Sequence, residues 1–353
     1  MTVLKLGSLF DGIGVFPLAA VHCGIEPVWA SEIEARPISI TRRHFPDMLH
    51  LGDITKISGA EVPPVDVITF GSPCQDLSQI GTRNGFAGKK SSLFYQAMRI
   101  IEEMRYATNG RYPAFCIWEN VAGAFSSNDR LDFAAMLSAF TGAEVSVPPR
   151  GWAHAGMVRG RRADTAWRLL DAQYWGEPAL VQRRKRVFVV ADFAGQRAGE
   201  VLFKPRTVLP FSTISGPGGL SATQRGGVPV AQTGRQVPIV RPFSLRRMRT
   251  MAQVGDQKGF CASFGRGGEP FPTLLASVTA PFSFWYEGEE RDGFLRVLTP
   301  LECERLMGLP ENWTKYGCKN EEISDHARYR ALGNSIALPC AEYVMAGIAE
   351  VMN

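Results

Sequence analysis

Short apolar, β-branched runs recur along the first 194 residues, and helical spacing of apolar residues appears between them. Runs of this kind are typical of strands buried in a parallel sheet, and several of them stop at glycine or proline. The predicted strands are 4–10, 27–32, 49–54, 65–70, 115–121, 167–172 and 186–191. Between two of them, apolar residues from Leu93 to Met104 follow helical spacing. This alternation predicts an α/β fold with a mixed, mostly parallel sheet.

The pattern weakens after residue 194. Glycine and proline become frequent, and residues 195–286 contain eleven Lys and Arg against three Asp and Glu. A basic, loop-rich segment fits a surface that holds phosphates and reads base edges, although a basic surface or a linker would have the same composition. Order returns at 298–308, where Thr299 and Pro300 predict the start of a helix, and near 333–335, which precedes a final apolar helix.

Composition narrows the class of protein. The chain has 353 residues, of which 45% are hydrophobic and 21% charged, with a net charge of +5. No apolar run is long enough to span a bilayer and no signal peptide precedes the first strand, so we expect a cytoplasmic protein without membrane contact. Its seven cysteines form no CxxC pair. We therefore expect reduced thiols, with neither a metal site nor a disulfide framework.

The turn after the first strand predicts a nucleoside site. Gly12 and Gly14 allow backbone amides to approach a polar ligand, and Glu32 ends the next strand roughly twenty residues later, where such folds bind ribose hydroxyls. Asp53 and Ile54 follow a third strand and could contact an adenine. The third glycine of the dinucleotide fingerprint is absent, which favours a mononucleoside over a pyrophosphate. Taken alone, Glu32 or Asp53 could equally be a solvated acid at the end of a strand.

A second group of candidates follows other strands. Cys74 lies in a Gly/Pro loop after a buried strand, and Glu119 stands at the carboxyl end of another. A cysteine there can act as a nucleophile, and a carboxyl at an apolar edge can hold a proton near neutrality. The four cations 183–186 run directly into a buried strand, so we expect at least one arginine at the same sheet edge. The glycine-rich loop 81–90 would suit phosphates or be a solvated surface loop.

In this order, these segments resemble the DNA (cytosine-5) methyltransferases over nearly the whole chain except its basic middle. The motifs that carry the resemblance are Phe-Asp-Gly-Ile-Gly at 10–14, Ser-Pro-Cys-Gln at 72–75, Glu-Asn-Val at 119–121, the Gln-x-Arg-x-Arg pattern at 182–186, the block 298–310 and Gly-Asn-Ser at 333–335. Val15 stands where many members have glycine, and extra residues at 176–182 leave open whether Arg183 or Arg184 faces the base. Residues 146–162 match nothing that we recognise.

The resemblance implies a reaction. The Cys74 thiolate would attack C6 of a flipped-out cytosine, Glu119 would hold and protonate N3, and Arg184 would hold O2. The cofactor residues it implies are Phe10, Gly12, Ile13, Gly14, Glu32, Ile33, Asp53, Ile54, Pro73, Leu93, Asn334 and Ser335. The implied contacts to the base and the DNA are Gln75, Ser78, Gly81, Arg83, Asn120, Val121, Gln182 and Arg186.

The same resemblance implies the cofactor, the partner and the domains. The cofactor would be S-adenosylmethionine, without a metal, and the substrate a specific sequence in double-stranded DNA, bound by a monomer in a bacterial cytoplasm, whether the gene is bacterial or from a phage. Residues 1–194 and 325–353 would form a Rossmann-like methyltransferase domain, with the C-terminal helix returning to it. Residues 195–324 would form a smaller, loop-rich target-recognition domain and hinge.

Three other functions remain open at this stage. An RNA cytosine-5 methyltransferase would use the same catalytic parts, and transfer only to RNA would identify it. A nicotinamide-dependent oxidoreductase would share the glycine turn and Glu32, but it would leave Cys74, Glu119 and the basic segment without a role. A non-catalytic DNA-binding relative would not need the catalytic residue types that are present.

Overall fold

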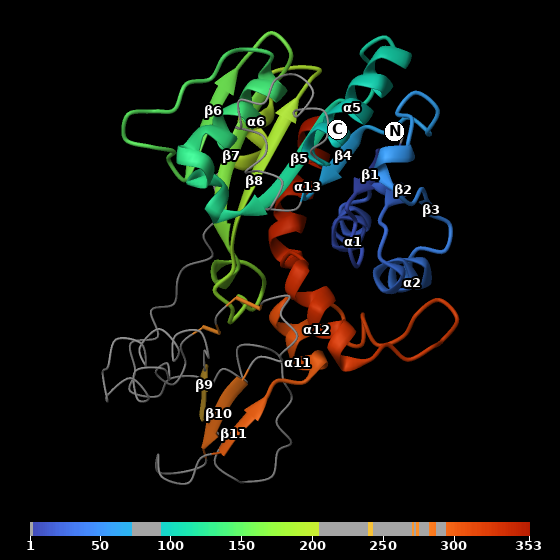
Figure 1. The fold of residues 1–353 in the computed structure, drawn as a ribbon, viewed down its shortest axis with the longest axis vertical. Coiled ribbons are helices and arrows are strands. Elements are labelled where there is room, and N and C mark those ends of the chain that lie inside the picture. Colours follow the sequence, from blue (N-terminus) through green and yellow to red (C-terminus); the bar gives the residue numbers. More distant parts are fainter. Residues whose placement is uncertain are drawn as a thin grey trace. The chain divides into compact units, whose positions relative to one another are not determined.

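The computed structural model describes residues 3–72, 93–204, 239–242, 270–271, 273–274, 282–286 and 294–353 (Figure 1). The chain divides into two compact units. The first consists of Met1–Leu170, Lys185–Pro205 and Ala341–Asn353, and the second of Asp171–Arg184 and Arg206–Cys340. The second unit therefore includes 171–184 and 325–340, whereas the prediction places these residues in the methyltransferase domain. The role of a target-recognition domain stays a prediction.

The first unit is built on an eight-stranded sheet, with the order β3-β2-β1-β4-β5-β8-β7-β6. Its strands are β1 (Lys5–Leu9), β2 (Glu26–Ser31), β3 (Leu49–His50), β4 (Val67–Phe70), β5 (Phe115–Val121), β6 (Ala155–Arg159), β7 (Asp164–Asp171) and β8 (Lys185–Asp192). Neighbours from β3 to β5 are parallel, whereas β8 runs antiparallel to β5 and β6 antiparallel to β7. The predicted mixed, mostly parallel sheet is confirmed.

Helices follow most of the parallel strands. In the first unit they are α1 (Val15–His22), α2 (Ala35–His44), α5 (Leu93–Ala107), α6 (Leu131–Thr141) and α7 (Ala198–Leu202), with short 3-10 turns η1 (Ile54–Lys56), η3 (Ala122–Phe125) and η4 (Ser127–Arg130). The predicted helical face of α5 is buried. A continuous apolar cluster contains Phe94 of α5, Phe140 of α6, and Phe70 and Trp118 of the sheet, all fully buried. This packing fixes the strands whose ends carry the candidate site.

Strand β6 lies within 146–162, the stretch without a recognised counterpart. It forms an edge of the sheet through antiparallel pairing with β7. No residue of β6 is buried, and Met157 is 41% exposed. An edge strand with so little burial lacks the apolar run by which the other strands could be recognised.

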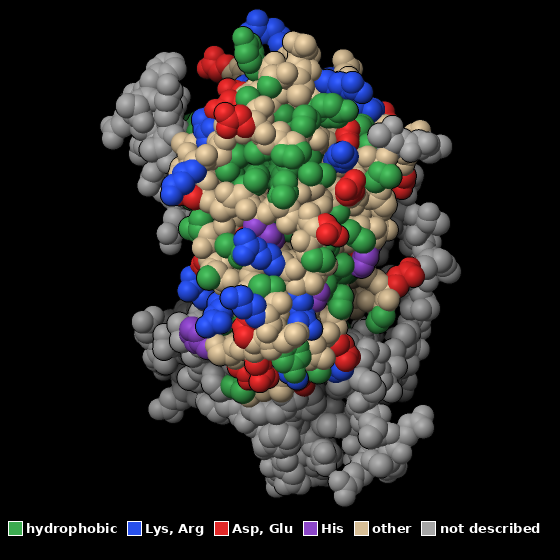
Figure 2. Space-filling view, turned by 90° about the vertical axis from the view of Figure 1, so that its right-hand side faces the viewer, with side chains coloured by type: hydrophobic (Ala, Val, Ile, Leu, Met, Phe, Trp, Pro, Cys, Tyr) green, Lys and Arg blue, Asp and Glu red, His purple; other side chains and the backbone are tan. Residues whose placement is uncertain are grey.

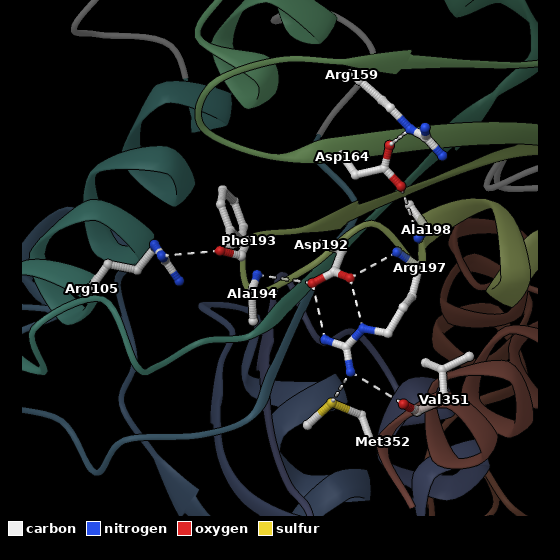
Figure 3. A network of polar contacts seen from close by, with 10 residues as sticks. All are labelled: Arg105, Arg159, Asp164, Asp192, Phe193, Ala194, Arg197, Ala198, Val351 and Met352. Atoms are coloured by element: carbon white, nitrogen blue, oxygen red, sulfur yellow. Dashed lines mark hydrogen bonds and ion pairs between the residues drawn. The ribbon is translucent and has the colours of Figure 1, made fainter.

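The C-terminal helix α13 (Leu338–Met352) belongs to the first unit from Ala341 onward. Its last turn is held by a network around the buried Asp192, at the end of β8 (Figure 3). Arg197 donates from Nε to one carboxylate oxygen of Asp192 at 2.9 Å and from Nη2 to the other at 3.2 Å, and its Nη1 donates to Val351 O at 3.2 Å. One arginine thus joins the sheet to the end of the chain.

The second unit contains a three-stranded antiparallel sheet, with the order β11-β10-β9, and helices near the C-terminus. Its elements are the 3-10 turn η5 (Ala172–Tyr174), β9 (Ile239–Pro242), β10 (Phe282–Tyr286), β11 (Phe294–Val297), α11 (Pro300–Leu306) and α12 (Asp325–Asn334). The predicted helix start is confirmed, because Thr299 and Glu302 form a capping box before α11. A buried ion pair of 3.0 Å joins Glu304 of α11 to Arg328 of α12.

Two further findings concern the described residues. None of their helices is by itself long and apolar enough to cross a membrane, and the bent pair α12 and α13 meets that test only when taken together.

On the face drawn in Figure 2, acidic side chains are scattered among lysine and arginine, and hydrophobic side chains gather in the upper part. That face therefore has mixed charge rather than a field of one sign.

Candidate active site

The loop after β1 has the backbone that its glycines predict. Phe10, Gly12 and Gly14 all adopt left-handed conformations, with φ of 55°, 59° and 78°. Gly14 is also confined, because a Cβ there would lie 2.9 Å from Thr41 Cγ2 and 3.0 Å from Phe45 Cε2. The loop therefore needs glycine at Gly14 for both its conformation and its space.

The carboxylate of Glu32 is fixed against this loop. Its Oε2 accepts a hydrogen bond from Gly12 N at 2.9 Å, and its Oε1 accepts from Ile33 N at 2.7 Å and from Glu34 N at 2.9 Å. Three backbone amides therefore orient and stabilise the carboxylate. Its four lone-pair positions still leave room for a ligand hydroxyl. The acid at the end of β2 and the glycine loop are brought together as predicted.

The other predicted cofactor residues of the first unit differ in exposure. The Asp53 carboxylate accepts from Thr55 N and Thr55 Oγ1, both at 2.9 Å, and these bonds lower the pKa of Asp53. Ile54 is buried in the core cluster, whereas Ile33 is 72% exposed and Leu93 half-buried. Their contacts with a cofactor stay predictions.

Glu119 lies at the carboxyl end of β5, and its Oε1 is 2.9 Å from Nε of Arg186. Both side chains are largely buried, with 11% and 13% exposed. Because β8 is antiparallel to β5, the beginning of β8 lies at this edge, and the register pairs Val121 with Arg186. The prediction that at least one arginine lies at the same sheet edge as Glu119 is confirmed. Gly71 leaves room for the acid, since a Cβ there would lie 3.1 Å from Glu119 Oε2.

The start of the cysteine loop is tied to the acid strand. Asn120 Nδ2 donates to Ser72 O at 2.9 Å, and Trp118 Nε1 donates to Ser72 Oγ at 3.1 Å. These bonds fix the backbone immediately before the nucleophile candidate. The remaining predicted residues of this loop, Pro73, Cys74, Gln75, Ser78, Gly81 and Arg83, lie outside the described residues.

The Arg184 side chain donates to backbone carbonyls of the second unit. It belongs to the second unit and is 1% exposed. Its Nη1 donates to Leu274 O and its Nη2 to Gly333 O, both at 2.9 Å, and Nη2 also donates to Ser335 O. The guanidinium thus holds the Gly333 to Ser335 turn. Contact of Arg184 with cytosine O2 is not tested by these bonds.

Two other predicted residues belong to the second unit. Gln182 is fully buried, and neither its Nε2 nor its Oε1 has a hydrogen-bond partner in the described part of the chain. Asn334 is exposed at the end of α12. Their predicted contacts with DNA and cofactor are not tested by these observations.

The sequence pattern predicts Asp11 only as part of a turn, and its burial in the structure is a new finding. Its carboxylate oxygens are shielded from solvent, and the Ser8 hydroxyl lies close to them. Burial raises the pKa of Asp11 to about 7, and the neighbouring Glu32 adds to the shift, whereas the Ser8 hydroxyl opposes it. The available signal was an acid placed between the strand and the first glycine. Among the described residues, no group of three or more His, Cys, Asp or Glu could hold a metal ion.

Comparison with protein families identifies the relatives of this chain. The family described as C-5 cytosine-specific DNA methylase matches residues 4–205 and 245–350. The chain is 22% identical to the Type II methyltransferase M.HhaI of Haemophilus parahaemolyticus, over 100% of this chain and 96% of that protein. It is 24% identical to the DNA N-6-adenine-methyltransferase of Escherichia phage P1, over 98% of this chain but 61% of the length of that protein.

Solved structures show the same fold. The S. pombe Dnmt2 methyltransferase superimposes with a TM-score of 0.58 at 15% sequence identity, and the match covers 100% of both chains. Entamoeba histolytica methyltransferase EhMeth matches with a TM-score of 0.60 at 12% identity, again over 100% of both chains. At these identities the likeness concerns the fold alone.

Proposed function

Because this chain belongs to the C-5 cytosine-specific DNA methylases, we propose that it transfers a methyl group from S-adenosylmethionine to C5 of a cytosine flipped out of a specific duplex DNA sequence. One observation carries the proposal. The ion pair of Glu119 and Arg186 lies beside the Gly71-Ser72 backbone that leads into Cys74. An acid, a cation and the approach to a thiol thus meet at one sheet edge.

The chemistry requires these groups. C5 of cytosine is a poor nucleophile, and thiolate attack at C6 makes the ring enamine-like, so that C5 can accept a methyl group. We assign the attack to Cys74. After transfer, loss of the C5 proton and elimination of the thiol release the product and restore the enzyme.

Glu119 would hold N3 and deliver a proton to it as the thiolate attacks. We assign the cation beside the base to Arg186 rather than to Arg184, because Arg186 contacts the acid, whereas the terminal nitrogens of Arg184 donate to backbone carbonyls. Arg186 would fix the orientation of Glu119 and stabilise negative charge that develops on the O2 edge. A fixed ion pair needs little rearrangement during the reaction.

The loop after β1 fits S-adenosylmethionine. Glu32 is oriented by three amides, Gly12 and Gly14 let the backbone approach, and Ile13 closes the loop from the core side with 2% exposure. When bound, the cofactor supplies an electrophilic methyl group on a sulfonium. In this proposal Glu32 binds the ribose hydroxyls, and Asp53 the adenine amino group.

DNA binding would involve the basic segment 195–286, most of which lies outside the described residues. Its excess of cations suits phosphates, and loops of this segment would read the neighbouring base pairs. We propose that the enzyme acts as a monomer in a bacterial cytoplasm. The similar methyltransferases of Haemophilus parahaemolyticus and of Escherichia phage P1 support this setting.

The name of the phage P1 relative raises a second product, N6-methyladenine. A direct transfer to an exocyclic amino group needs no covalent thiol adduct, so it would leave Cys74 without a role. We therefore favour cytosine, and mass spectrometry of the methylated nucleosides distinguishes 5-methylcytosine from N6-methyladenine.

The test is methyl transfer by the purified full chain to duplex DNA, followed by mass spectrometry of the nucleosides. We expect 5-methylcytosine, and bisulfite sequencing of DNA from expressing cells would give the recognised sequence. Cys74→Ser should abolish turnover but keep S-adenosylmethionine binding. Exclusive N6-methyladenine, methylation of RNA alone, or normal turnover by Cys74→Ser would contradict the proposal.

A further inference from the structure

A turn with unfavourable backbone angles follows β5, the strand that carries the candidate acid. Asn128, Asp129 and Arg130, none of them glycine, adopt left-handed conformations in succession, with φ of 47°, 51° and 73°. The buried carboxylate of Asp132 holds the turn, because it accepts from Ser127 Oγ at 2.5 Å and from Asn128 Nδ2 at 3.0 Å. Strained backbone of this kind persists where neighbouring contacts maintain it, commonly at functional sites. The side chain at the end of the turn, that of Arg130, is exposed.

Arg130 lies against the stretch 146–162. Its carbonyl oxygen accepts a hydrogen bond from Trp152 Nε1 at 3.0 Å. Its guanidinium covers Gly151, since a Cβ there would lie 3.0 Å from Arg130 Cζ and 3.2 Å from Nη1. Arg150 directly precedes this glycine and is also exposed. The turn after β5 and the stretch 146–162 thus bring two exposed arginines together.

The charges of these two arginines are not neutralised within the described part of the chain. Neither guanidinium has an ion pair or a hydrogen bond there. Two other arginines of the same stretch are paired, Arg159 with Asp164 at 3.1 Å and Arg162 with Glu102. Asp129 is exposed in the same turn as Arg130, and the two arginines outnumber it. The surface therefore keeps an excess of positive charge.

Aromatic rings give this surface a rigid base. Trp152 packs edge-on against Phe133 with ring centres 5.0 Å apart, and the ring of Trp167 lies 6.0 Å from that of Trp152. Phe125 contacts Phe133 at 4.8 Å and stacks on the exposed His154 at 6.4 Å. Phe133 and Trp167 belong to the buried core cluster. The backbone that carries both arginines is thus fixed, which lowers the entropy that is lost when a ligand binds.

The surface lies at the same edge of the sheet as the candidate acid. Its turn follows Val121, the last residue of β5, after η3. β7 ends where β8 begins, since Ala172 N donates to Arg184 O at 3.0 Å, and His154, just before β6, accepts from Leu169 N near the end of β7 at 2.7 Å. The order β5-β8-β7-β6 (Figure 1) puts three strand spacings, roughly 14 Å, between β5 and β6, which corresponds to about four base pairs of a duplex.

The inference rests on the proposed function, in which the substrate is duplex DNA. A guanidinium is a planar fork of donors that matches phosphate oxygens, and two exposed arginines with uncompensated charge suit a polyanion. We propose that Arg130 and Arg150 bind phosphates of the DNA backbone about four base pairs from the flipped-out cytosine. The stretch 146–162 is thereby a DNA contact separate from the basic segment 195–286, and it strengthens binding without selecting a sequence.

The experiment measures DNA binding by fluorescence anisotropy at several salt concentrations. It uses the purified full chain with S-adenosylhomocysteine and a long duplex centred on the cytosine that bisulfite sequencing identifies. Each phosphate contact contributes about 0.9 to the slope of log K against log salt concentration. Arg130→Ala combined with Arg150→Ala should therefore reduce the slope by about two and weaken binding about tenfold at low salt.

Arg161→Ala is the matched control. Arg161 is also exposed and unpaired among the described residues, but it follows Arg159 at the other end of β6. Its loss should leave the slope as in the parent. Arg130→Lys combined with Arg150→Lys keeps both charges and should keep most of the slope. Arg150→Ala alone should reduce the slope by about one, so the proposal can be tested even if Arg130→Ala disturbs the strained turn.

The outcomes are distinguishable. An unchanged slope in the double alanine variant, or an equal reduction in Arg161→Ala, overturns the assignment of this surface. If the parent still forms 5-methylcytosine in DNA, the proposed function stands despite that result. A parent that methylates only RNA contradicts the proposed function, and the assignment of this surface to DNA fails with it.

Discussion

Asp11 should make the cofactor-free protein less stable as the pH rises, and Asp11→Asn should remove that effect. The pKa of Asp11 is raised from 3.8 to about 7 by burial. Between these two values the folded protein binds more protons than the unfolded chain, so ionisation opposes folding. The penalty is absent below the unfolded pKa and complete above the folded pKa. Asparagine has nearly the same shape and carries no charge at any pH.

The size of the effect follows from the shift. Three pKa units correspond to roughly 4 kcal/mol at alkaline pH, and about 2–3 kcal/mol of this should develop between pH 5 and pH 8. The charged neighbour is Glu32, which adds to the shift. For a unit of this size, the melting temperature of Asp11→Asn relative to the parent should rise by about 5–10 °C over the same interval.

The assay is thermal unfolding of both proteins without cofactor, followed by circular dichroism at several pH values. Asp53→Asn is the matched control with the opposite sign. Hydrogen bonds from Thr55 lower the pKa of Asp53, so this acid contributes stability above its unfolded pKa and loses it as the pH falls. A difference between Asp11→Asn and the parent that is the same at pH 5 and pH 8 would refute the reasoning.

Three other substitutions test separate parts of the molecule. Arg186→Gln should lower turnover by about 10²–10³, since it removes a preorganised cation from Glu119, and should leave S-adenosylhomocysteine binding unchanged in calorimetry. Glu304→Gln should lower the free energy of unfolding by about 3–5 kcal/mol in urea titrations, because it breaks a buried ion pair. The control Glu302→Gln, at a half-buried position where glutamine keeps the capping box, should not. Arg197→Ala should speed hydrogen exchange in 341–353, and unchanged exchange there would contradict the role of this arginine.

Most of the sheet was predictable because its strands are apolar runs with sharp ends. β1, β2, β4, β5 and β8 all lie where the pattern places them, within one or two residues at each end. β6 was not predicted, because an exposed edge strand has no apolar run. A strand that is buried on both faces is a nearly continuous apolar run, and such a run can be recognised in the sequence.

The segments that form the site could be predicted, but the contacts of their side chains could not. Pattern and resemblance placed Arg184 and Arg186 together, yet they donate to different groups, since Arg184 meets backbone carbonyls from distant parts of the chain. Asp11 was missed for a related reason. A short loop acid is usually exposed, and only the packing of the strands around it shows that its carboxylate is shielded.

The network at Asp192 also bears on the order in which the protein is synthesised. Arg197 reaches Val351 across 154 positions of sequence, and the first unit includes Ala341–Asn353. Domains often fold as they emerge from the ribosome, beginning with the N-terminal one. Here the first unit needs residues 341–353, which emerge only after the residues of the second unit have been synthesised. A nascent chain halted before Ala341 would therefore lack the bonds that join α13 to Arg197 and Leu202, and this interval is when a chaperone would be needed.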